Sequence, residues 1–138
     1  MNRDLHNNVK FSRGLSPVAA TTDNTAYVSQ IIDTANFNST EFIILTGSLA
    51  DADATFAVLV EDGNNSALSD NAEVAAAFLL GTEAGTSFTF AADDTTRKIG
   101  YIGAKRYVRV TITPANNTGN VFLAGVWAQA GARTAPQA

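Results

Sequence analysis

The chain has 138 residues and a formal net charge of −4, with 46% apolar and only 16% charged residues. This length suits one domain with its own core, and the net acidic charge argues against general nucleic-acid binding, which needs a basic face. The absence of cysteine excludes disulfides and thiolate chemistry. No apolar run is long enough for a signal peptide or a membrane span, so we expect synthesis in a cytoplasm and no membrane partner.

Charges of opposite sign occupy different parts of the chain. Every carboxylate except Asp4 lies between residues 14 and 94, a stretch without Lys or Arg, whereas residues 95–138 hold basic residues and no Asp or Glu. Such a separation suits a protein that makes complementary contacts with itself or with a charged surface. The alternative is that the fold pairs acidic strands with basic strands, so that the charges cancel inside the domain.

Alternation of apolar and polar residues, rich in β-branched and aromatic side chains, predicts about eight short strands separated by Asn, Asp, Gly and Pro turns. In chain order these strands are Val9–Leu15 (an edge strand), Thr25–Asp33, Glu41–Leu49, Ala54–Asp62, Thr86–Ala91, Lys98–Ile102, Lys105–Pro114 and Asn120–Ala130.

One segment departs from this alternation. In Ser69–Leu80 a potential N-cap serine precedes an alanine-rich stretch that ends at Gly81, which predicts one short helix or helical turn in a long crossover loop. Many close strands with a single helix predict an all-β domain over residues 1–138, an antiparallel two-sheet β-sandwich of the jelly-roll type. The ends, about 1–8 and 131–138, show no pattern and are expected to form extended arms.

The sequence offers no catalytic constellation. His6 is the single histidine and lies in the polar N-terminal arm, without a scaffold to hold orienting partners. Asp51 and Asp53 have the spacing that begins a calcium loop, but Thr55 and Phe56 occupy positions where such a loop needs an oxygen ligand and a glycine. We therefore predict a protein that is not an enzyme, with no catalytic residue, no metal site and no cofactor.

A basic strand face is the first candidate for a contact with a partner. In Lys105–Pro114, alternation places Val108 and Val110 toward the core and Lys105, Tyr107 and Arg109 on the opposite face. Arginine and tyrosine are enriched at protein interfaces. The alternative is that acidic side chains of neighbouring strands neutralise this face.

The arms and the first strand are the second candidate. Late strands of a jelly roll lie between early ones, so strand charges partly cancel within the domain. Charges on arms and on outward positions cannot cancel in this way, and they are expected to order on a partner. The candidate residues are Arg3, Lys10, Arg13 and Arg133.

Four segments of the chain carry a resemblance to a known family. They are NRDLHNNVKFSRGLSPVA at residues 2–19, LLGTEAG at 79–85, RKIGYIGAKRYVRVTI at 97–112 and AGARTAP at 130–136. Together they resemble the capsid cement (decoration) proteins of tailed bacteriophages, of the type found on Bordetella phage heads. The resemblance implies a jelly roll, a homodimer, and attachment to the major capsid protein on the outside of an icosahedral head. It carries no list of binding residues.

These observations lead to one expectation and one alternative. We expect a structural virion protein, made in the bacterial host cytoplasm and located on the outer surface of the head, that stabilises the capsid by bridging major capsid protein subunits. The alternative is a virion-borne carbohydrate-binding or tail/host-attachment module, because jelly rolls also bind sugars and fold does not decide function. Trp127 is the single tryptophan available for a sugar platform.

Overall fold

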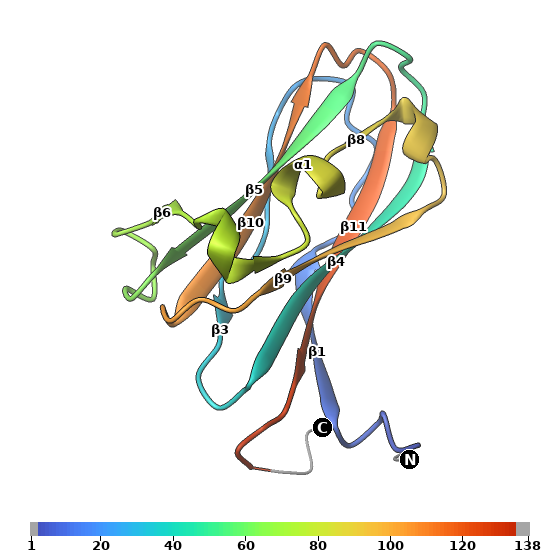
Figure 1. The fold of residues 1–138 in the computed structure, drawn as a ribbon. Coiled ribbons are helices and arrows are strands. Elements are labelled where there is room, and N and C mark those ends of the chain that lie inside the picture. Colours follow the sequence, from blue (N-terminus) through green and yellow to red (C-terminus); the bar gives the residue numbers. More distant parts are fainter. Residues whose placement is uncertain (1–2, 135–138) are drawn as a thin grey trace.

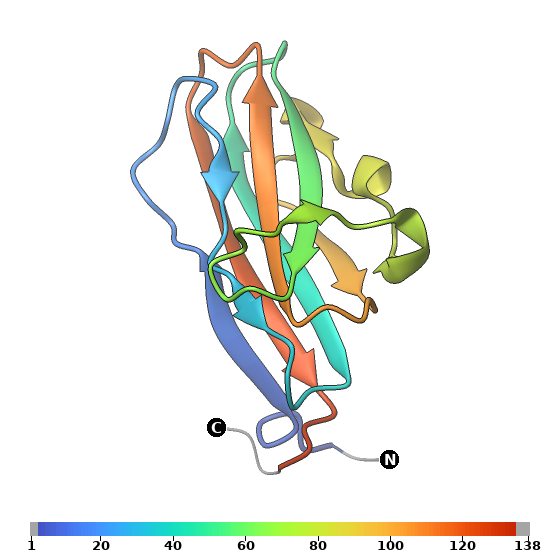
Figure 2. The same cartoon turned by 90° about the vertical axis from the view of Figure 1, so that its left-hand side faces the viewer.

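The computed structural model describes residues 3–134 and consists of two antiparallel β-sheets packed face to face (Figures 1 and 2). The strands are β1 (Val9–Leu15), β2 (Tyr27–Val28), β3 (Ile32–Asp33), β4 (Ser39–Leu49), β5 (Thr55–Gly63), β6 (Ala72–Glu73), β7 (Leu79–Leu80), β8 (Phe88–Thr89), β9 (Thr96–Tyr101), β10 (Tyr107–Ala115) and β11 (Val121–Ala130). One α-helix, α1 (Glu83–Thr86), and two 3-10 turns, Ala76–Phe78 and Phe90–Ala92, complete the described elements.

The two sheets are built from both halves of the chain. One has the strand order β1-β11-β4-β9-β7, and the other has the order β2-β10-β5-β6, with β3 also beside β10 and β8 beside β5. β11 therefore lies between the early strands β1 and β4, and β10 lies between the early strands β2 and β5. This arrangement confirms the predicted all-β class and the antiparallel two-sheet sandwich of jelly-roll type.

The core lies between the sheets and is centred on aromatic side chains. Phe42 of β4 meets Trp127 of β11 edge to face, with ring centroids 4.7 Å apart, and Phe56 stacks on Phe88 at 4.8 Å. The indole N–H of Trp127 donates to the carbonyl of Gln30 at 3.1 Å, so the buried ring leaves no donor unpaired. Such edge and offset contacts add to the free energy gained from apolar burial.

The predicted strand Thr25–Asp33 is interrupted because its middle turns from one sheet to the other. The N–H of Ser29 donates to the carbonyl of Val110 on β10, whereas the N–H of the next residue, Gln30, donates to the carbonyl of Gly14 on β1. The chain then returns to β10, where Ile32 pairs with Val108. Two short strands, β2 and β3, result from this crossing.

The helix predicted for Ser69–Leu80 is corrected to an extended segment with a single 3-10 turn. Val74 is the reason: its side chain is 4% exposed in the core and its N–H donates to the carbonyl of Val60, which keeps the segment along β5. The alanines that favour a helix are exposed. Short helices depend on tertiary packing, and here the packing of Val74 and Leu79 in the core stabilises the extended chain instead of a helix. The α-helix of the domain starts later, at Glu83, where the Thr82 side chain caps it.

Both ends of the described chain lie at the same end of the sandwich (Figures 1 and 2). The Asp4 carboxylate accepts hydrogen bonds from the backbone and side-chain N–H groups of Asn7, at 3.0 and 2.8 Å, and so closes a turn before β1. At the other end, the N–H of Arg133 donates to the carbonyl of Asn36 in the β3–β4 loop. The outermost parts of the predicted arms, residues 1–2 and 135–138, lie outside the described residues. No helix between residues 3 and 134 is long and apolar enough to cross a membrane.

Candidate interaction surfaces

The candidate contact residues occupy two regions. Lys105, Tyr107 and Arg109 lie at and just before the start of β10, in the sheet that contains β5. Lys10 and Arg13 lie on β1, and the other two candidates lie in the terminal segments, Arg3 before β1 and Arg133 after β11.

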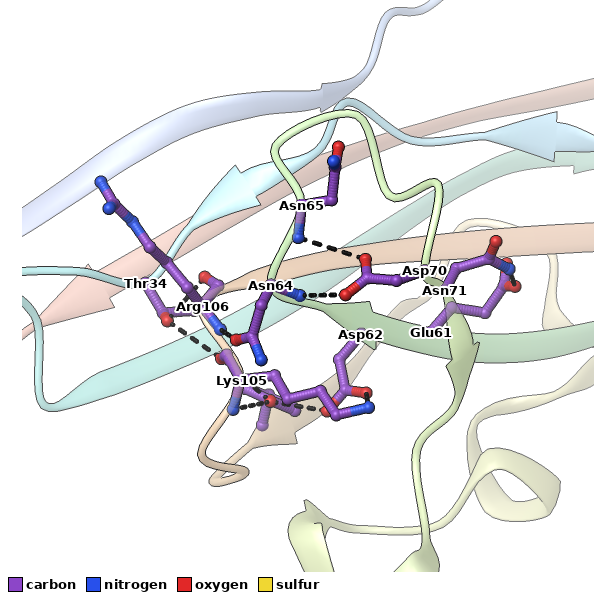
Figure 3. A network of polar contacts seen from close by, with 10 residues as sticks. Thr34, Glu61, Asp62, Asn64, Asn65, Asp70, Asn71, Lys105 and Arg106 are labelled. Atoms are coloured by element: carbon purple, nitrogen blue, oxygen red, sulfur yellow. Dashed lines mark hydrogen bonds and ion pairs between the residues drawn. The ribbon is translucent and has the colours of Figure 1, made fainter.

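Folding pairs both cations of the β10 group with carboxylates of the acidic half. The Lys105 ammonium lies 3.5 Å from an oxygen of Asp62 (Figure 3), and the Arg109 guanidinium lies 3.1 Å from an oxygen of Glu61, its register partner on β5. The acidic cross-strand neighbours expected as the alternative are thus present. These ion pairs neutralise Lys105 and Arg109 within the chain, so their charges do not require a binding partner.

A buried tyrosine holds the turn between β9 and β10 against β5. The Tyr101 hydroxyl donates to the carboxylate of Asp62 at 2.7 Å, and it accepts from the N–H of Lys105 at 3.1 Å. Burial, and then the hydrogen bond with Asp62, raise the pKa of Tyr101 far above its ordinary value. The hydroxyl therefore stays protonated and serves as a fixed structural donor.

Arg106 makes a further ion pair that sequence reasoning missed. Its Nε and Nη2 donate to the two oxygens of Asp33 at 2.9 and 2.8 Å, and its guanidinium lies 5.2 Å from the centroid of the Tyr107 ring. The hydrogen bonds from Arg106 lower the pKa of Asp33. Only the pairing of β3 with β10 brings Asp33 close, and the alternation pattern carries no signal for that pairing.

The cations of the termini and β1 lack such carboxylate partners. Within residues 3–134, no ion pair involves the side chains of Arg3, Arg13 or Arg133. The ammonium of Lys10 lies 6.0 Å from the ring centroid of Phe37, in the β3–β4 loop. Among residues 3–134, positive charge without an ion pair is therefore found on β1 and the two terminal segments, and also at Arg97 and Lys98 on β9.

The outward face of the β1-β11-β4-β9-β7 sheet is apolar, a feature that the sequence analysis missed. We call it the apolar sheet face. The strand register places its outward side chains in rows across the sheet, one running from Phe11 through Ala128 and Glu41 to Gly100 and Leu80. Its apolar members are Phe11, Ile43, Leu45, Leu80, Phe122, Ala124, Val126 and Ala128.

The other sheet has a different outward face. Its strands carry the Arg109–Glu61 and Arg106–Asp33 pairs at this surface, and among the described residues Val28 is the single large apolar side chain exposed on them. A sequence signal for the apolar sheet face did exist. In β4 and β11 both alternating sets of positions are largely apolar, as in EFII and FLAGVW, which indicates strands with two apolar faces.

Two carboxylates of the described chain, Asp51 and Asp53, lie together at a cavity. An open cavity of about 600 Å³ lies at the loop end of the sandwich and is lined by Asn24, Asp51, Asp53, Asn116, Asn117 and Thr118. The Asp51 carboxylate accepts from the N–H and hydroxyl of Thr118 at 2.7 and 3.0 Å, and these bonds lower its pKa. Within residues 3–134, no three His, Cys, Asp or Glu side chains are grouped so as to hold a metal ion.

By its sheets and strand order, the chain belongs to the class of antiparallel β-sandwich proteins. No family model matches the sequence, and no curated protein matches it. A family two carbohydrate esterase from Cellvibrio japonicus is similar in structure, with a TM-score of 0.46 and 8% identity, over 94% of this chain and 36% of the esterase.

Two other solved structures show a comparable likeness. The structure of infectious bursal disease virus Gx strain has a TM-score of 0.43 and 10% identity, over 88% of this chain and 31% of that chain. The module CBM35 from Paenibacillus barcinonensis has a TM-score of 0.41 and 11% identity, over 94% of this chain and 99% of the module. The chain spans about a third of the length of the esterase and viral chains that it matches. These likenesses carry no argument about function.

Proposed function

We propose that the protein is a structural component of a phage particle, a cement protein that binds the outer surface of an icosahedral head and bridges subunits of the major capsid protein. The proposal is supported by the four segments that resemble such proteins. The structural observation that carries it is the contrast in charge: cations of the second sheet are paired within the chain, whereas Arg3, Arg13 and Arg133 have no ion pair among residues 3–134.

Ligand linkage supplies the mechanism. Packaged DNA pushes capsid subunits apart, and a protein that binds only the expanded shell stabilises that state by its binding free energy. The effect is multiplied because many copies bind each shell, and bridging contacts hold neighbouring subunits at high effective concentration. Cations at the terminal segments and on β1 suit an acidic shell surface, and they increase the association rate at low salt.

Co-sedimentation with empty shells tests this function. Purified protein is mixed with expanded heads and with unexpanded precursor heads assembled from the tailed-phage major capsid protein that the proposal makes its partner. We expect saturable binding to expanded heads and resistance of the decorated heads to heat or chelators. Absence of binding to both kinds of shell would refute the proposal.

The cavity at the loop end favours a second candidate function, a carbohydrate-binding or host-attachment module. Its carboxylates, amides and hydroxyl are groups that can hydrogen-bond sugar hydroxyls. Glycan-array binding that is lost in Asp53→Ala would favour this candidate. Copy number separates the two functions, because a cement protein is present in hundreds of copies per particle and a tail component in about a dozen or fewer.

A further inference from the structure

We propose that the apolar sheet face is the interface between two copies of this chain, packed sheet against sheet about a two-fold axis. The proposal goes beyond shell binding and does not depend on it. It rests on the exposure, the flatness, the size and the charges of this face.

Exposure is the first observation. Phe11, Leu45, Leu80 and Phe122 are 44–56% exposed, on four different strands of one sheet. Single exposed apolar side chains are ordinary, but a contiguous group across a sheet marks a surface that another protein covers.

The face is also flat enough to receive a second sheet. β11, which lies beside the central strand β4, presents the short side chains Ala124, Val126 and Ala128 outward, between the larger Phe11 of β1 and Ile43 of β4. Sheets that pack face to face come within ~10 Å of each other, which requires side chains that interdigitate without bulky obstacles in the middle.

The size of the face is sufficient for a stable dimer. Five strands at a spacing of ~4.8 Å and an outward stretch of roughly nine residues at ~3.3 Å per residue give about 600 Å² after allowance for the short edge strands. Two copies would then bury about 1,200 Å² in total, which reaches the range of specific protein interfaces.

The apolar character of this face favours a second copy of the chain over a partner that binds only transiently. Interfaces that form and dissolve are about as polar as ordinary surface, whereas homodimer interfaces are more apolar. A second copy is present from synthesis onward and covers the face at all times. The face also carries both signs of charge, with Glu41 near its centre and Arg13 and Lys98 flanking the next row, so two copies can be complementary in charge.

Oligomeric state under a matched pair of substitutions tests the proposal. Leu45→Asp places a charge on the apolar sheet face, and Val28→Asp places the same charge at a similarly exposed position on the other sheet (47% and 52% exposed). By size-exclusion chromatography with light scattering at micromolar concentration, we expect the wild type and Val28→Asp to have twice the chain mass of 14.5 kDa. Leu45→Asp is expected to have the mass of one chain.

A second variant keeps the test decisive if Leu45→Asp does not fold, as judged by circular dichroism. Phe11→Asp alters the face from its edge strand and is expected to dissociate the dimer in the same way. The proposal is overturned by a monomeric wild type, by a dimer that survives both substitutions, or by equal dissociation in Val28→Asp. A monomeric wild type that loses shell binding on Leu45→Asp would assign the face to the shell instead. Failure of shell binding with a dissociable dimer would overturn only the cement function.

Discussion

Arg109 and Arg106 both bind a carboxylate of the acidic half of the chain, but their ion pairs differ in exposure. The side chains of Arg109 and Glu61 are 23% and 14% exposed, whereas those of Arg106 and Asp33 are 54% and 44% exposed. A pair that is largely removed from water leaves a poorly solvated charge when one partner is lost, whereas an exposed pair is replaced by water at little cost.

Arg109→Met is therefore expected to lower the free energy of unfolding by about 2 kcal/mol, and Arg106→Met by less than about 1 kcal/mol. Methionine keeps most of the aliphatic volume, so the difference reports the charge. Urea unfolding at neutral pH measures both values. Equal losses in the two variants would contradict the assigned difference in burial.

The carboxylate of Asp70 makes the stability of the loop between β5 and β6 depend on pH. Its carboxylate accepts from the backbone N–H groups of Asn64 and Asn65 at 2.9 and 3.1 Å (Figure 3), and these bonds lower its pKa from the ordinary 3.8. A carboxylate with a lowered folded pKa stabilises the protein above its unfolded value and loses this contribution as the pH falls through the folded value.

Asp70→Asn should consequently be less stable than the wild type at pH 7, and the stabilities of the two should converge as the pH falls through the lowered folded pKa of Asp70. Urea midpoints measured from pH 7 to the acid limit of the folded protein test this. A gap that is constant with pH would show that the side-chain shape, and not the charge, is what the loop requires.

Residue-level prediction from the sequence succeeded where strand register decides the contact. The alternation in Lys105–Pro114 predicts which side of the strand Arg109 faces, and it is compatible with an acidic cross-strand neighbour. The identity of that neighbour, Glu61, and the pairing of Arg106 with Asp33 follow from strand order in space. Alternation along a single strand does not specify which strands are neighbours in the sheet.

At the scale of elements, β1 joins the sheet through a close contact between glycines and an aromatic ring. Gly14 of β1 and Gly125 of β11 face the ring of Phe42, and a Cβ added at Gly125 would lie 2.5 Å from its Cζ. Phe42 is fully buried against Trp127, so the ring has no room to withdraw.

Gly125→Ala is expected to cost about 1–3 kcal/mol of unfolding free energy because it overpacks this contact. Gly47→Ala is the matched control: its added Cβ would lie 3.1 Å from the Cβ of Phe122 on the outward face, a longer contact than the one at Gly125. Thermal unfolding compares the two variants. A loss in Gly47→Ala as large as in Gly125→Ala would contradict the role given to the Phe42 ring.

The long strands could be predicted from the sequence because each has its own alternation and its own turn signals. β1, β4, β5, β10 and β11 begin and end within about two residues of the predicted bounds. Local preference was overridden in Ser69–Leu80, where burial of Val74 outweighed the helix propensity of the alanines. The apolar sheet face was hidden because an apolar run is compatible with a strand buried on both sides as well as with one that another chain covers.

Across the whole molecule, the separation of charge along the chain becomes in part a pairing of charges in space. β10, from the basic half, lies between β2 and β5 of the acidic half, whereas β11 lies between β4 and the cationic strand β1, and the three ion pairs of the described chain join the two halves. Charge segregation in the sequence therefore reflects the crossed topology of the sandwich. Among residues 3–134, the cations that remain without an ion pair lie on the terminal segments and β1, together with Arg97 and Lys98 on β9.

The cations of the terminal segments, which have no ion pair among residues 3–134, determine the expected salt dependence of shell binding. Arg3→Ser combined with Arg133→Ser removes two cations that have no ion pair among residues 3–134, and we expect about a tenfold weaker affinity for expanded heads, equivalent to ~1.4 kcal/mol. Wild-type binding should weaken as salt rises, because exposed charges are screened beyond ~10 Å at 0.1 M and ~3 Å at 1 M. The double variant should show a shallower salt dependence.

Arg106→Ser, which removes a cation paired with Asp33, is the control and should bind like the wild type. An equal loss in the control, or a double variant with unchanged salt dependence, would show that shell binding does not use the terminal cations.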